Sequence, residues 1–247
     1  YNKVDHQTGL APYFREILRL ELGKIFSEKD ENNEYIIKKS NGEKFDLYSD
    51  GLKIYTSIDS RMQKHAEKAV ESHFKNYLQT AFDRNNEKNK NKPFSNDITK
   101  SQADTILARA LKQSMLYKKL VGEACSYCER PKKYIIKKEE GFECSYCGTV
   151  SPFHTKDEIA KKLNEKRTIK VFDWQSENFE KDTLFSTKDS VKYYKGLLRA
   201  GLMSMNPHNG EIKAWVGGPN FKHFKYDMVK KGRRQVGSTF KPFVYAT

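Results

Sequence analysis

Ser238 and Lys241 are three residues apart in a segment where the sequence predicts that a helix begins. Proline is tolerated in the first turn of a helix, where backbone N–H groups lack intrahelical acceptors, so Pro242 places the helix start near Ser238. Residues three apart share one helix face, and an unprotonated Lys241 amine could accept the proton of the Ser238 hydroxyl. The spacing therefore predicts a serine nucleophile beside a candidate base, as in a serine acyltransferase.

The Ser-x-x-Lys spacing alone is a weak signal. Ser72 and Lys75 have the same spacing inside an ordinary amphipathic helix pattern. Ser238 differs because Gly237 precedes it, and because a predicted strand and a Gly-rich turn lie upstream. This context favours a catalytic interpretation of Ser238 and Lys241 over a merely structural pair.

All four cysteines lie in two Cys-x-x-Cys pairs separated by fifteen residues, Cys125 with Cys128 and Cys144 with Cys147. Four thiolates at this spacing are typical of zinc ribbons, because they complete a tetrahedral site with no position left for water. The sequence predicts one structural zinc ion here, and two disulfides are the alternative. The histidines show no ligand spacing and are interpreted as surface or packing residues.

Residues 201–218 predict a β-hairpin around a Pro-His-Asn-Gly turn. Fifteen residues later comes segment 234–243, Arg-Gln-Val-Gly-Ser-Thr-Phe-Lys-Pro-Phe. Together these two segments resemble the start of the transpeptidase domain of class A penicillin-binding proteins. Residues 9–18 resemble the end of that family's glycosyltransferase domain, and residues 48–59 resemble the strand that leads to the transpeptidase. Asp173-Trp174 and residues 189–194 also resemble family segments.

The resemblance covers residues 1 to about 120 and 165–247, and a cysteine-bearing insert interrupts it. It implies an α+β fold in which the chain is an internal fragment of a longer protein. The expected parts are the end of the glycosyltransferase domain (1–47), a linker with the start of the transpeptidase region (48–120), a zinc-ribbon-like insert (121–150) and the first part of the transpeptidase domain, ending in the Ser-x-x-Lys helix (151–247).

What the resemblance implies about function is a peptidoglycan synthase that cross-links stem peptides. Ser238 would attack the carbonyl of the penultimate D-alanine with Lys241 as base, and β-lactams would trap the same serine. Glycan polymerisation from a lipid-linked precursor would belong to a missing N-terminal part with a membrane anchor, at the periplasmic, extracytoplasmic face of the cell membrane. We expect the fragment itself to be inactive, because the family's Ser-x-Asn and Lys-Thr-Gly motifs would lie in a missing C-terminal part.

The chain carries 46 Lys and Arg against 32 Asp and Glu, a formal net charge of +14. This charge attracts polyanions and does not choose among nucleic acid, anionic lipid and a precursor diphosphate. Because the lysines are spread along the chain and no RNA-binding aromatic motif is present, we expect no nucleic-acid partner. Two alternatives stay open: a zinc-ribbon nucleic-acid-binding protein, which leaves the Ser238 context unexplained, and a serine β-lactamase or β-lactam sensor, which does not account for residues 9–16.

The elements that must position these groups follow from periodicity and turn signals. A cap at Asp59 opens a helix whose apolar face is Met62, Ala66, Ala69, Val70, Phe74 and Leu78. Further helices are expected over 10–24, 99–120, 157–164 and 190–200, strands over 35–37 and 45–48 around Asn41-Gly42 and over 169–172, and a polar loop over 83–96.

Overall fold

The structure is a computed structural model that describes residues 9–246 of the chain. Helices are combined with small antiparallel sheets, which confirms the predicted α+β class. The chain forms two compact units, named here unit 1 (Tyr1–His73 with Arg199–Thr247) and unit 2 (Phe74–Leu198). Within the described residues, no helix combines the length and the apolarity needed to cross a membrane.

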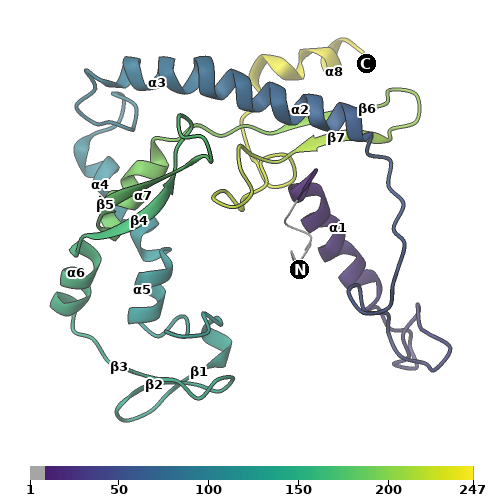
Figure 1. The fold of residues 1–247 in the computed structure, drawn as a ribbon, viewed down its shortest axis with the longest axis horizontal. Helices are drawn as coiled ribbons and strands as arrows, with labels where there is room; N and C mark the ends of the chain where they lie inside the picture. The colour runs from purple at the N-terminus through teal and green to yellow at the C-terminus, as the bar shows by residue number, and fades with distance from the viewer. Residues whose placement is uncertain (1–8, 247) are drawn as a thin grey trace. The chain divides into compact units, whose positions relative to one another are not determined.

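Unit 1 is built on an antiparallel hairpin against which two helices pack (Figure 1). Its elements are α1 (Pro12–Ile25), α2 (Ser60–His73), β6 (Leu202–Met205), β7 (Ile212–Val216), the 3-10 turn η3 (Gly237–Phe240) and α8 (Lys241–Tyr245). The hairpin predicted over 201–218 is confirmed, with Leu202 opposite Val216 and a bulge after Ser204. The predicted helix over 10–24 is also confirmed as α1, which has Pro12 in its first turn.

Aromatic side chains form the core of unit 1. Tyr13 of α1 packs edge-on against Phe221, with ring centroids 4.9 Å apart, and Trp215 of β7 completes the buried cluster. Gly217 and Gly218 lie against the Tyr13 side chain, and a Cβ added to Gly217 would come within 2.6 Å of the ring. Only glycine permits this approach. Residues 9–18 and 201–218, both of which resemble family segments, therefore share one core.

Helix α2 begins where the sequence predicts. The Asp59 carboxylate caps it by accepting a hydrogen bond of 2.8 Å from the Arg61 N–H. The predicted apolar face is partly wrong, because Met62 and Ala69 are exposed whereas Ala66 and Val70 are buried.

The centre of the buried face of α2 is a polar residue, Gln63, which is fully buried. Its side-chain amide donates a hydrogen bond of 2.9 Å to the Trp215 carbonyl, and its carbonyl oxygen accepts one of 2.7 Å from the Trp215 N–H. The Gln63 side chain therefore pairs with β7 much as a neighbouring strand would. The face of α2 that carries Gln63 is turned towards β7, and Met62 lies outside that face.

The strands predicted over 35–37 and 45–48 are not formed. Around Asn41-Gly42 the chain makes only isolated antiparallel bridges, Lys29 with Tyr35 and Lys38 with Lys44. No apolar layer covers this segment, and an uncovered two-stranded ribbon is marginal in water. The linker strand expected within 48–59 is likewise an extended segment outside the named strands.

Unit 2 contains helices, a hairpin and a small three-stranded sheet. Its elements are the π-helical turn η1 (Phe74–Leu78), α3 (Gln79–Asn86), α4 (Lys100–Lys112), α5 (Met115–Leu120), the 3-10 turn η2 (Lys132–Tyr134), β1 (Ile135–Lys137), β2 (Gly141–Cys144), β3 (Val150–Pro152), α6 (Lys156–Asn164), β4 (Arg167–Phe172), β5 (Glu180–Phe185) and α7 (Thr187–Lys195). The elements predicted over 157–164 and 169–172 are confirmed as α6 and β4, whereas the pairing strand β5 was not predicted.

The helix predicted over 99–120 is wrong as a single element. It is divided into α4 and α5, because the Ser114 hydroxyl accepts a hydrogen bond of 3.3 Å from the Tyr117 N–H and starts a new helix. The polar loop predicted from Asp83 begins only after Asn86, since α3 continues to that residue.

The helix predicted over 190–200 is displaced towards the N-terminus. Ser186 and Asp189 form a capping box that starts α7 at Thr187, and Gly196 ends it. Two side chains of α7 hold the end of β4: the Tyr193 hydroxyl donates to the Phe172 carbonyl (2.8 Å), and the Tyr194 hydroxyl accepts from the Phe172 N–H (3.1 Å). The family-like segments 173–174 and 189–194 therefore lie together.

Candidate functional sites

The Ser238 and Lys241 pair occupies the junction of η3 and α8 in unit 1. Gly237 has a positive φ of 51°, and the Lys241 N–H donates to the Ser238 carbonyl, so the two residues lie within one helical turn. Pro242 lies in the first turn of α8, as predicted. The helical structure thus begins at Gly237, next to the predicted nucleophile.

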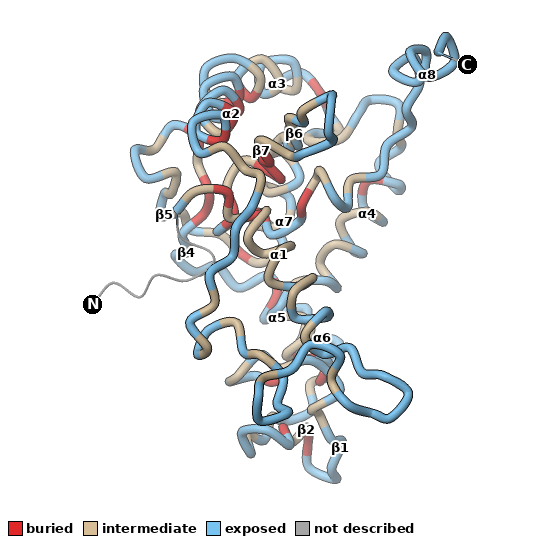
Figure 2. Tube along the Cα trace, turned by 90° about the vertical axis from the view of Figure 1, so that its right-hand side faces the viewer, coloured by how far each residue is buried: buried red, intermediate tan, exposed pale blue. Residues whose placement is uncertain are grey.

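Ser238 and Lys241 are both exposed. In Figure 2 the tube of α8 has the pale blue of exposed residues. Among the described residues, no hydrogen bond joins the Ser238 hydroxyl to the Lys241 amine. The neighbouring aromatic residues of η3 and α8 are also exposed: Phe240, Phe243 and Tyr245. These side chains therefore do not bury Ser238 or Lys241. The backbone places nucleophile and base in one turn, and the side chains are not held in attack geometry.

A buried carboxylate organises the loop that leads from β7 towards Ser238. Asp227 accepts a hydrogen bond of 2.9 Å from the Trp215 indole N–H and others from the N–H groups of Val229 (2.8 Å) and Lys230 (3.0 Å). No sequence motif predicts this role of Asp227. Beyond it, a pocket of about 410 Å³ is bordered by Arg234 and does not include Ser238.

The four cysteines of unit 2 converge. Their four sulfur atoms all lie within 4.8 Å of one another. The Sγ atoms of Cys125 and Cys147 are 3.5 Å apart, and those of Cys128 and Cys144 are 3.7 Å apart. Cys125 and Cys144 are buried, and Cys147 is exposed. All four thiols are free, so this cluster presents four sulfur ligands to one point.

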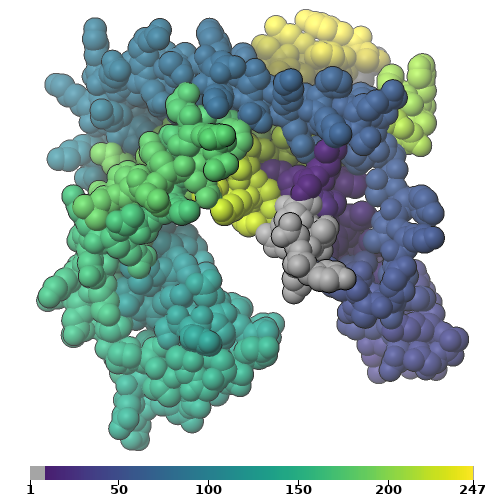
Figure 3. Space-filling model, viewed as in Figure 1, coloured from purple at the N-terminus to yellow at the C-terminus, as the bar shows by residue number. Residues whose placement is uncertain are grey.

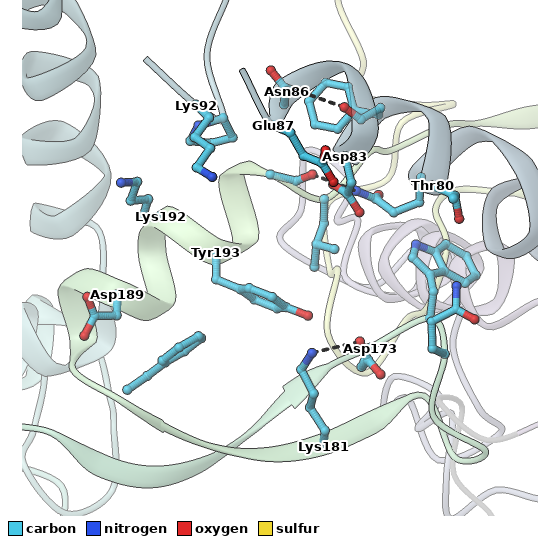
Figure 4. Close-up of a pocket in the computed structure, with 18 of the residues that line it drawn as sticks. Thr80, Asp83, Asn86, Glu87, Lys92, Asp173, Lys181, Asp189, Lys192 and Tyr193 are labelled. Carbon is cyan, nitrogen blue, oxygen red and sulfur yellow. Dashed lines mark hydrogen bonds and ion pairs between the residues drawn. The ribbon is translucent and has the colours of Figure 1, made fainter. Parts of the chain in front are cut away.

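A pocket of about 730 Å³ in unit 2 is lined by residues of α3, β5 and α7 and of the loops beside them (Figure 4). Burial acts to raise the pKa of the Asp173 carboxyl, but a hydrogen bond from the Ser176 hydroxyl and an ion pair of 3.1 Å with Lys181 outweigh it, so the pKa is lowered. The lining holds four acidic and four basic side chains, Asp83, Glu87, Asp173 and Asp189 with Lys92, Lys166, Lys181 and Lys192. This balance selects no class of ligand, and none of the predicted site residues lines the pocket.

The chain is similar to penicillin-binding proteins along nearly its whole length. A family model described as the penicillin-binding protein middle domain matches residues 150–198, which carry α6, β4, β5 and α7. Penicillin-binding protein 1A of Rickettsia prowazekii (strain Madrid E) is 24% identical over 98% of this chain and 26% of its own length. Penicillin-binding protein 1A of Neisseria cinerea is 23% identical over 99% of this chain and 27% of its own length.

A shorter stretch is more similar. Penicillin-binding protein 1A of Vibrio cholerae (serotype O1) is 50% identical over 44 residues, which are 18% of this chain and 5% of that protein. The chain spans about a quarter of the length of the curated relatives that it matches along its whole length. No solved structure matches it.

Proposed function

Because this chain belongs to the class A penicillin-binding proteins, we propose that it is part of a peptidoglycan synthase in which Ser238 is the acylated nucleophile. The supporting observation is the single helical turn, opened by Gly237, that carries both Ser238 and Lys241. The rest of the glycosyltransferase domain and the membrane anchor of that synthase would lie outside these 247 residues, and the site would act at the extracytoplasmic face of the membrane.

The proposed reaction is acyl transfer in two steps. The Ser238 oxygen attacks the carbonyl carbon of the penultimate D-alanine of a stem peptide, while the Lys241 amine takes the hydroxyl proton. The tetrahedral intermediate releases the terminal D-alanine, whose amine receives a proton, and leaves an ester on Ser238. An amine of a neighbouring stem peptide then takes the acyl group and frees the serine. A β-lactam would acylate Ser238 in the first step and remain attached.

The proposed domain organisation keeps the ranges expected from the sequence: 1–47 end of the glycosyltransferase domain, 48–120 linker and start of the transpeptidase region, 121–150 insert, and 151–247 first part of the transpeptidase domain. Support for the last range comes from the middle-domain match, which begins at residue 150. In unit 1, α1 from the first range packs against β7 from the last, so these two ranges are joined by a common core.

The first prediction concerns acylation by penicillin. In the complete protein that contains this chain, a fluorescent penicillin should label the wild type and fail to label Ser238→Ala, because the attacking oxygen is lost. Lys241→Ala should slow labelling about 10²–10⁴-fold, since general-base assistance is removed. Labelling is measured by fluorescence after denaturing electrophoresis.

Ser72→Ala is the matched control, because Ser72 and Lys75 repeat the spacing without the glycine turn, and it should be labelled normally. The separate 247-residue chain should not be labelled, because its Ser238 and Lys241 are exposed and unsupported. Undiminished labelling of Ser238→Ala would refute the assignment of the nucleophile. The alternatives of a nucleic-acid-binding protein and of a β-lactamase or sensor are disfavoured by the similarity to penicillin-binding protein 1A over 98% of the chain.

A further inference from the structure

We propose that Cys125, Cys128, Cys144 and Cys147 bind one zinc ion as a closed, structural tetrathiolate site. A zinc–sulfur bond of about 2.3 Å in a tetrahedron places the sulfur atoms about 3.8 Å from one another. Two of the separations in the cluster, 3.5 and 3.7 Å, approach this value, and all four sulfurs lie within 4.8 Å of one another. The cysteines thus already surround a space of the size that zinc requires.

The two Cys-x-x-Cys turns share two backbone features. The Cys125 N–H donates a hydrogen bond of 2.9 Å to the Arg130 carbonyl, five residues later, and the Cys144 N–H donates one of 2.9 Å to the Thr149 carbonyl, also five residues later. The residue after each second cysteine has a positive φ, 59° at Glu129 and 73° at Gly148. Two equivalent turns therefore present two pairs of sulfurs to a common point, which a single four-ligand ion explains.

Hydrogen-bond donors already point at the sulfur atoms. The Cys128 N–H lies 3.4 Å from the Cys125 sulfur, and the Thr149 hydroxyl lies 3.2 Å from the Cys147 sulfur. Zinc binds cysteine as the thiolate, and thiolate sulfurs are strong acceptors. Between the two turns, the Arg130 guanidinium lies 3.6 Å from the centroid of the Tyr146 ring and 5.0 Å from that of Tyr134. Arg130 belongs to the first turn and Tyr146 to the second, so this stack connects the two halves of the site.

The insert has almost no apolar core of its own. Its atoms gather in one small group (teal, near residue 140 on the colour bar of Figure 3). Tyr127, Ile136, Tyr146 and Val150 are exposed, and Phe142 packs edge-on against Phe153, which lies just beyond the insert, with ring centroids 4.8 Å apart. A segment of this size needs a metal ion or covalent bridges to be ordered, so metal binding and folding should be one event.

The test compares zinc with disulfides in the complete protein, purified without reductant or chelator. Zinc is measured by mass spectrometry, and free thiols are titrated before and after chelation. We expect one zinc ion per chain, with four thiols that become reactive only when the zinc is removed. If the protein contains no zinc and no free thiols, the four cysteines form two disulfides and the proposal is wrong. Four free thiols that still take up no zinc from added zinc sulfate would also overturn the proposal.

Variants separate a ligand from a disulfide partner. Cys147 is exposed, so Cys147→His has room for a ring nitrogen that can bind zinc and cannot form a disulfide. Cys147→His should retain zinc, whereas Cys147→Ser and Cys144→Ser should lose most of it. Tyr127→Phe, in the first turn, is the matched control and should keep the full content. Equal zinc content in Cys147→Ser and the wild type would exclude the four-cysteine site.

The readout is independent of the proposed transpeptidase reaction. Penicillin labelling of Ser238 in Cys144→Ser should remain largely intact, since the insert belongs to unit 2 and Ser238 to unit 1. The zinc content of Ser238→Ala should equal that of the wild type. Failure of either proposal therefore leaves the other testable.

Discussion

Gln63 and Gln79 each use a side-chain amide in place of a backbone partner. Gln63 takes up both hydrogen-bonding groups of Trp215 in unit 1. In unit 2, the Gln79 amide donates to the Gly196 carbonyl (3.0 Å), and its oxygen accepts from the Leu198 N–H (3.0 Å). Both glutamines are buried, so without them these backbone groups would lose their partners away from water. Each glutamine thus joins a helix to a distant segment of the same unit.

Replacement of Gln63 by leucine should destabilise unit 1. The leucine has a similar volume but leaves the Trp215 N–H and carbonyl without partners, and each buried unpaired group costs about 1–3 kcal/mol. We expect Gln63→Leu to lower the free energy of unfolding by about 2–4 kcal/mol, measured by urea denaturation of the 247-residue chain. Gln113→Leu, at an exposed position, is the control and should change it by less than about 0.5 kcal/mol. If Gln63→Leu changes the free energy of unfolding as little as the control does, water has replaced these hydrogen bonds.

Helix α7 depends on its capping box, which reaches from the loop into the first turn. The Asp189 carboxylate accepts hydrogen bonds from the Ser186 hydroxyl (2.7 Å) and the Ser186 N–H (3.1 Å), and these bonds lower the pKa of Asp189. A carboxyl whose pKa is lowered by folding stabilises the folded state above its ordinary pKa, and this contribution is lost as the pH falls through the folded value. The start of α7 should therefore weaken in acid.

Asp189→Ala tests this cap. At neutral pH it should lower the free energy of unfolding by about 1 kcal/mol, because α7 loses its capping box. The difference from the wild type should shrink as the pH falls through the lowered pKa of the folded Asp189 carboxyl, because protonation then removes the cap from the wild type as well. Circular dichroism during denaturation at several pH values measures both effects. Asp182→Ala, at an exposed position of β5, is the control, and its free energy of unfolding should differ little from that of the wild type. An effect of Asp189→Ala that does not change with pH would argue against the cap.

The sequence predicts elements well where local signals act alone. Helix α2 begins at the predicted cap Asp59, α1 matches the apolar periodicity of residues 10–24, and the β6–β7 hairpin forms around the Pro-His-Asn-Gly turn. Predictions fail where a distant contact decides. The inner face of α2 follows Gln63 and its bond to Trp215, and β5 exists through its pairing with β4. The strands expected around Asn41-Gly42 fail for the opposite reason, because no distant layer covers them.

The same distinction applies to the candidate sites. The spacing of the cysteines predicts a cluster, and the structure brings all four sulfurs together. The spacing of Ser238 and Lys241 predicts a shared turn, which is observed, but not the contacts that would orient the two side chains. The roles of Asp227 and Gln63 arise from bonds to Trp215, which no local pattern reveals.

At the scale of the whole molecule, each unit has its own core, so a defect in one should leave the other intact. Gly218→Ala places a methyl group against the Tyr13 side chain and should destabilise unit 1 by about 1–3 kcal/mol, seen by thermal denaturation. Gly23→Ala is the matched control. Gly23 is exposed in the last turn of α1 with open space around it, so alanine there should stabilise by up to about 0.5–1 kcal/mol.

The zinc content of unit 2 should be the same in both glycine variants, because the cysteine cluster shares no core residue with Tyr13. Loss of zinc in Gly218→Ala would show that the two units fold as one body. Equal stability of Gly218→Ala and Gly23→Ala would mean that α1 moves aside at little cost.

The chain contains two tryptophans, and they are divided between the cores. Trp215 lies in unit 1 with its indole N–H bonded to Asp227, whereas the indole N–H of Trp174 in unit 2 has no partner among the described residues. Each unit therefore carries one tryptophan in a distinct environment. With Trp174→Phe the remaining tryptophan emission comes only from the unit that holds Ser238, and with Trp215→Phe it comes only from the unit that holds the cysteines. Two single-tryptophan chains can thus follow the melting of each unit optically, without any attached dye.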